Sequence, residues 1–155
     1  MKNLKAWAFV LLVACTLPVI SCKKDKEDNL YTVNNAPMSG AQEFPAVTTT
    51  ATGSFDASYN RDSKQLTITV RWQGLSGNAT LAHIHGPAAK GANAGVLQNF
   101  TPILSLTPAG SFSTSFTLNG TNQKEEDLLG GKWYVNIHTA AHPGGEIRGQ
   151  IELTY

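Results

Sequence analysis

The chain is 155 residues long, its formal net charge is +1, and 15% of its residues are charged. That length suits one domain with a hydrophobic core of its own. Residues 37–155 carry seven Lys or Arg and eight Asp or Glu, so no basic excess indicates nucleic acid as a partner. The only cysteines are Cys15 and Cys22, which excludes an internal disulfide or a thiolate ligand from the chain beyond Cys22.

The N-terminal segment has the pattern of an export signal. Two lysines precede an apolar, uncharged run over residues 6–20, which is shorter than the roughly 20 residues that span a bilayer. The run leads into "VISC", residues 19–22, which resembles a bacterial lipobox. We therefore expect residues 1–21 to be a lipoprotein signal peptide and Cys22 to be the lipidated first residue after cleavage.

A short charged run follows the cysteine. Residues 23–29, "KKDKEDN", hold three lysines and three acidic residues, which is typical of a solvated tether. A charged tract in this place also resembles signals that send some Gram-negative lipoproteins to the outer membrane or the cell surface. We expect residues 22–36 to form the lipidated cysteine and its tether, and residues 37–155 to form the domain.

The rest of the chain is expected to form short strands. Residues 65–73, "QLTITVRWQ", alternate apolar and polar side chains, as half-buried strands do. Similar patterns predict further strands at residues 48–59, 79–85, 110–118, 133–139 and 146–153.

One short helix is expected over residues 122–131, where Asn122 and Glu125 resemble a capping box and Gly130 or Gly131 ends the helix. Many short strands with one helix predict an all-β fold. The expected architecture is an antiparallel Greek-key β-sandwich or barrel, immunoglobulin-like or Cu/Zn-superoxide-dismutase-like.

The last two predicted strands are joined by "AAHPGG" and are expected to form a hairpin. One register matches apolar to apolar side chains, whereas a slip of one residue would oppose apolar to polar throughout. That register pairs Trp133 with Ile151, Val135 with Gly149, Ile137 with Ile147, Asn136 with Arg148, and His138 with Glu146.

The polar face of this hairpin is therefore expected to carry a cluster of His138, Glu146, Asn136 and Arg148. A charged Glu146 beside His138 would raise the pKa of the histidine. On residues 79–85, two further histidines share the face opposite to the apolar side chains. They join the cluster if their strand lies in the same sheet, which the pattern alone leaves open.

Three interpretations of the histidines remain open. In the first, His83, His85 and His138 bind a metal, with Glu146 orienting His138 and the loop residue His142 closing the site. A ligand set of imidazoles without thiolate suits Cu(II) or Zn(II).

In the second interpretation, the same residues form a hydrogen-bonded network, with His83 or His85 holding the loop "GPAAKGANAG" through its backbone carbonyls. In the third, the loops form a recognition surface. Hydrolytic catalysis is disfavoured because no G-x-S-x-G motif is present.

Two long stretches, "LSGNATLAHIHGPAAKGANAGV" and "GKWYVNIHTAAHPGGEIRGQI", resemble the signature stretches of the CHRD (chordin) domain family, and "MSGAQEFPAVTTTATGSFDASYN" resembles its opening stretch. The chain is identified as a bacterial lipoprotein member of that family, with the likeness running from Met38 to Leu153. The matching positions are Gly40, Ala41, Glu43, Pro45, His83, His85, Gly86, Pro87, Asn136, His138, Pro143, Gly144, Glu146, Arg148 and Gly149. His142 falls at a position that is freer in the family.

The resemblance implies an extracytoplasmic β-sandwich module without a settled activity, and the growth-factor binding of animal members does not transfer to it. We expect an exported, lipid-anchored, non-enzymatic binding or structural module at the outer membrane. Its partners would be the membrane, through its lipid, and an extracytoplasmic ligand or protein. The alternative is a His-rich protein that binds copper or zinc and, with copper, is redox-active.

Overall fold

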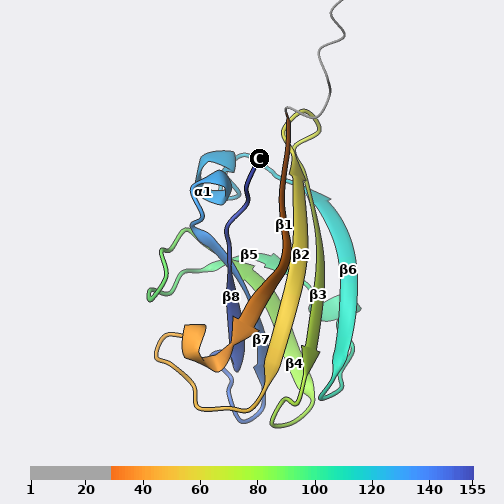
Figure 1. Ribbon diagram of the computed structural model, residues 1–155, viewed down its shortest axis with the longest axis vertical. Helices are drawn as coiled ribbons and strands as arrows, with labels where there is room; N and C mark the ends of the chain where they lie inside the picture. The colour runs from red at the N-terminus through yellow and green to blue at the C-terminus, as the bar shows by residue number, and fades with distance from the viewer. Residues whose placement is uncertain (1–28) are drawn as a thin grey trace, which may run out of the picture.

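The computed structural model describes residues 29–155, so the expected signal peptide, Cys22 and most of the charged run lie outside the described residues. The described chain is mostly β-strand (Figure 1). Its elements are β1 Leu30–Ser39, η2 Gly40–Gln42, β2 Thr52–Asn60, β3 Gln65–Gln73, β4 Ala79–His85, β5 Val96–Asn99, η3 Thr101–Ile103, β6 Gly110–Thr117, α1 Glu125–Leu129, β7 Trp133–Thr139 and β8 Ile147–Ile151. No helix between residues 29 and 155 is both long enough and apolar enough to cross a membrane.

The eight strands of the described region form one antiparallel sheet in the order β5-β4-β7-β8-β1-β2-β3-β6. Strands β8 and β1 are paired only at Arg148 and Ser39, and the sheet curls at this junction (Figure 1). The half formed by β5, β4, β7 and β8 thereby faces the half formed by β1, β2, β3 and β6. The predicted all-β antiparallel fold of sandwich or barrel type is confirmed, with one continuous sheet supplying both layers.

The hydrophobic core fills the space between the two halves. Phe55 and Ile68 from one half, and Val135 and Ile147 from the other, are fully buried in the same cluster. Gly149 of β8 allows this close approach, since a Cβ there would lie 2.8 Å from the ring of Phe55. Each half of the sheet has one apolar face. The two apolar faces pack against each other, which gives the fold its two layers.

The register predicted for the last hairpin is confirmed. Strands β7 and β8 pair Trp133 with Ile151, Val135 with Gly149, Ile137 with Ile147, and Asn136 with Arg148. Strands β3, β4 and β7 have the bounds that their alternation predicts. Strong alternation over seven or more residues thus located both these strands and the faces that they turn to the core.

Several expected boundaries are wrong. Strand β1 begins at Leu30, so residues 30–36, which were expected to belong to the tether, lie in the sheet. The helix starts later than expected, and its N-cap is Lys124 without a side-chain bond. Asn122, the expected cap, instead accepts a hydrogen bond from the side chain of Asn119. The short strand β5 was not predicted because four residues are too few to show a period.

Two loops cover the outer face of β4, β7 and β8. We call them the 40–51 loop, which includes η2, and the 86–95 loop, and both lie to the left in Figure 1. The side chain of Asn93 ties them together by donating a hydrogen bond of 2.7 Å to the carbonyl oxygen of Phe44. Because of this cover, all seven residues of β7 are buried, including those that alternation assigned to a polar outer face.

Candidate functional site: three histidines beneath two loops

The pairing of β4 with β7 brings the three histidines together. In this pair His83 lies opposite Asn136, His85 lies opposite Tyr134, and Leu81 lies opposite His138. All three imidazoles point away from the core, because their strand positions alternate with those of the buried aliphatic residues. Strand β4, which carries His83 and His85, therefore lies beside β7, which the sequence alone left open.

The imidazoles of His83, His85 and His138 converge on one point, and we call this group the three-histidine cluster. Each ring offers a nitrogen, and these nitrogens all lie within 4.8 Å of one another. The shortest separation is 3.2 Å, between Nδ1 of His83 and Nε2 of His138. His142, which was expected to close the site, does not belong to this group.

Hydrogen bonds to two backbone carbonyls fix which ring nitrogen of His85 and of His138 carries the hydrogen. His138 Nδ1 lies 2.9 Å from the carbonyl oxygen of Pro143, and His85 Nδ1 lies 3.0 Å from that of Ala94. A carbonyl oxygen only accepts, so both Nδ1 atoms carry the hydrogen. In the neutral rings, both Nε2 atoms therefore hold a lone pair, and the buried Nε2 of His85 has no hydrogen-bond partner. Backbone contacts of this kind orient histidines in metal sites.

A stacked column of side chains lies beside the cluster. The ring of Tyr134 stacks on that of His85 with an interplanar angle of 6°, and the guanidinium of Arg148 lies 3.3 Å from the centre of the Tyr134 ring. Arg148 also donates to the carbonyl oxygen of Ala92 and to Gln150. The column thus fastens the 86–95 loop to the sheet, as does the bond of His85 to Ala94 that the network interpretation expected.

Glu43 of the 40–51 loop reaches the same buried region, and its role was not predicted beyond its match to the family. Its side chain is buried, and its Oε1 has no hydrogen-bond partner. Burial raises the pKa of Glu43 from 4.5 to about 7, while the charge of Arg148 and a hydrogen bond from Asn136 oppose that rise. Asn136 connects this carboxyl to the cluster, because its Oδ1 lies 2.9 Å from Nε2 of His138.

The expected contact between His138 and Glu146 is wrong. The carboxylate of Glu146 lies just before β8 and accepts hydrogen bonds from the side chains of Thr49, Ser76 and Thr139, and from the backbone N–H of Ser76. Burial alone would raise the pKa of Glu146, but these bonds lower it. Glu146 therefore anchors the 40–51 loop and the turn after β3, and it does not orient His138.

The expected rise in the histidine pKa is wrong for the same reason. With no carboxylate in contact, burial lowers the pKa of His138, and the bond to Pro143 only opposes this. Burial also lowers the pKa of His85. For His83, burial followed by the nearby His138 lowers the pKa from 6.5 to about 4. The cluster is therefore neutral at pH 7 in the absence of a bound cation.

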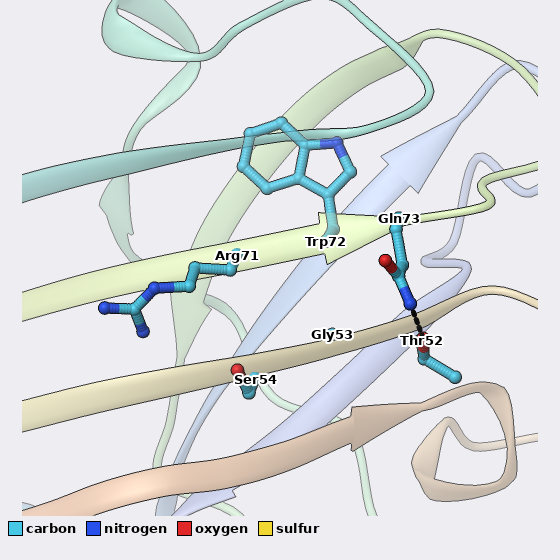
Figure 2. Close-up of a pocket in the computed structure, with 6 residues that line it drawn as sticks. All are labelled: Thr52, Gly53, Ser54, Arg71, Trp72 and Gln73. Carbon is cyan, nitrogen blue, oxygen red and sulfur yellow. Dashed lines mark hydrogen bonds between the residues drawn. The ribbon is translucent and has the colours of Figure 1, made fainter.

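Two hollows differ in their relation to the cluster. One, of about 320 Å³, lies on β2 and β3 around Trp72, where Gln73 bonds to Thr52 (Figure 2). Arg71 at its edge pairs with Asp56, and none of the residues that line this hollow belongs to the three-histidine cluster. The other, of about 560 Å³, lies between the two loops and is lined by Glu43, Phe44, Pro45, Lys90, Arg148 and Gln150, among others.

Comparison with known proteins supports one family. A family model described as the CHRD domain matches residues 35–151, which includes the three-histidine cluster and both loops. No curated protein and no solved structure matches the chain.

Replacing Arg148 by Ala is expected to destabilise the fold by about 2–4 kcal/mol, because the carbonyl of Ala92 and the buried amide of Gln150 lose their donor. The matched change Arg71→Ala removes an exposed ion pair with Asp56 and is expected to cost less than about 1 kcal/mol. Urea unfolding measures both. An equal loss of unfolding free energy in the two variants would show that Arg148 does not hold the 86–95 loop.

Replacing His83 by Gln tests the direction of its pKa shift. The unfolded histidine takes up a proton below pH 6.5, whereas the folded one does so only below about pH 4. The metal-free wild type should therefore lose roughly 2–3 kcal/mol relative to His83→Gln as the pH falls from about 6.5 to 4. Glu43 titrates with the opposite sign between about pH 4.5 and 7, but it is common to both proteins and cancels in the difference. A difference that stays constant across this range, measured by urea unfolding after chelation, contradicts the shift.

Proposed function

The chain belongs to the CHRD-domain family, and on that premise we propose that it is a lipid-anchored binding module of the outer membrane, without enzymatic activity. Cys22 would carry the lipid, and the charged run after it would hold the domain off the membrane surface. The partner would be an extracytoplasmic ligand or protein that contacts the loop-covered face.

The observation that supports a binding module is the hollow of about 560 Å³ between the two loops. Its walls combine the exposed ring of Phe44 with the charges of Lys90 and Arg148. Binding sites are commonly carried by loops on a rigid sheet, and buried polar side chains fix both loops here. A preformed hollow of this kind needs little reordering when a partner binds.

A second candidate function is the binding of Zn(II) or Cu(II) by the three-histidine cluster. The specific observation in its favour is that one ring nitrogen from each of the three histidines lies within 4.8 Å of the other two. The bonds of Nδ1 to Ala94 and Pro143 leave Nε2 of neutral His85 and His138 with a lone pair. Three imidazole nitrogens form a common ligand set for these ions.

The lipid anchor is tested by labelling. Cells that express the full chain are grown with radioactive palmitate, and the protein is expected to take up the label through Cys22. The variant Cys22→Ala should lose the label, whereas Cys15→Ala, the matched change inside the signal, should keep it. Label retained in Cys22→Ala, or wild-type protein absent from the outer-membrane fraction, would refute the proposed anchoring.

Metal binding is tested on the full chain, purified in detergent and stripped with a chelator. One Zn(II) or Cu(II) per chain is expected, and a free concentration of 100 times the Kd should stabilise the fold by about 2.7 kcal/mol. His138→Ala should abolish this gain, and His142→Ala should preserve it because His142 lies outside the cluster. If neither ion binds and neither shifts the melting temperature, this second function is ruled out.

A further inference from the structure

We propose that the side-chain oxygen of Asn136 completes the three-histidine cluster as a fourth metal ligand, and that Glu43 is the positioning residue that holds it there. The inference rests on the second candidate function above, the binding of Zn(II) or Cu(II). It extends the site from β4 and β7 to the 40–51 loop.

The first argument concerns hydrogen-bond donors. Nδ1 of His138 donates to the carbonyl of Pro143, so Nε2 of the neutral ring can only accept. Oδ1 of Asn136 lies 2.9 Å from that Nε2, and an amide oxygen also only accepts. Two buried acceptors at this separation repel each other unless a positive group lies between or beside them.

The cluster has too few protons to satisfy its acceptors. Its lone pairs include Nε2 of His138, the unpartnered Nε2 of His85 and Oδ1 of Asn136. His83 contributes a single N–H when neutral, and its Nδ1 is in hydrogen-bond contact with His138. The surplus of converging acceptors suits a bound cation.

A metal ion fits this requirement better than a proton does. A proton binds one acceptor and is shared with at most one other, so it cannot satisfy the converging ring nitrogens and Oδ1 of Asn136 together. Zn(II) or Cu(II) would instead accept all the lone pairs at once. Three nitrogens and one oxygen would give the fourfold coordination that Zn(II) prefers.

The second argument concerns the orientation of the amide. An Asn side chain presents an oxygen at one end and an NH₂ group at the other. The NH₂ end of Asn136 faces the carboxyl of Glu43, since Nδ2 of Asn136 and Oε1 of Glu43 both lie beside Gly145, and its oxygen end faces His138. Both residues are almost fully buried, with exposed fractions of 1% for Asn136 and 7% for Glu43.

Gly145 supports this close packing. Its φ angle of +128° is one that glycine adopts without strain. A Cβ at this position would collide with the carboxyl of Glu43 and lie 2.7 Å from Nδ2 of Asn136. The backbone therefore leaves room for the carboxyl and the amide to meet.

The test compares variants of the full chain in detergent, with Zn(II) affinity measured by calorimetry and Co(II) absorption reporting the ligand set. Asn136→Leu removes the oxygen and should weaken Zn(II) binding by at least tenfold. Asn136→Asp keeps an oxygen and should keep the binding. Glu43→Leu should weaken binding about tenfold, which is in the range for residues that orient ligands. The matched control Glu126→Leu, on the exposed face of α1, should have no effect.

The outcomes separate the two proposals. If the wild type binds no metal, the second function fails and this inference fails with it. If the wild type binds but Asn136→Leu binds as tightly, only the role of Asn136 is overturned. If Asn136→Leu does not fold, the Co(II) spectrum of Asn136→Asp tests whether residue 136 is a ligand. A carboxylate ligand in place of an amide should shift the Co(II) bands, and an unchanged spectrum overturns the inference.

Discussion

The structure depends on the burial of a polar sheet face. The outer side of β4, β7 and β8 carries histidines, Asn136, Arg148 and Gln150, and two loops remove this side from water. Each polar group taken out of water must find a partner or lose free energy. The bonds from Arg148 to Ala92 and from Gln150 to Ala88 therefore hold the 86–95 loop, and the bond from Thr49 to Glu146 holds the 40–51 loop.

The same constraint sets the charge of the site. Arg148 stays charged because carbonyl and amide oxygens and the Tyr134 ring surround its guanidinium. The hydrogen bonds of His85 and His138 offset burial only in part, so the histidine pKa values fall, and burial pushes Glu43 toward its neutral form. Unprotonated imidazoles are the form in which histidine can bind a metal ion, as the second proposed function requires.

Binding by the loops and binding by the cluster need not be separate properties. Glu43 lines the hollow between the loops and also contacts Asn136, which lies against His138. A partner that displaced the 40–51 loop would disturb the hydrogen bonds around the cluster. Conversely, a cation in the cluster would hold Asn136 and Glu43 in place and stiffen that loop. The two functions would then be linked through one carboxyl and one amide.

The sequence by itself determined the strongly alternating strands β3, β4 and β7, their core-facing sides and the register of β7 with β8. Alternation has a period of two, and a slip of one residue would have exposed every apolar side chain. It also determined which histidines share a face, since His83 and His85 are two residues apart on one strand. Tertiary structure alone decided that β4 lies beside β7, because contacts between strands distant in the chain leave no local pattern. Tertiary structure also decided that Glu146 accepts hydrogen bonds from Thr49, Ser76 and Thr139. It likewise placed Glu43 beside Asn136. Both carboxyls belong to bends and loops, whose directions are set by packing and not by a period.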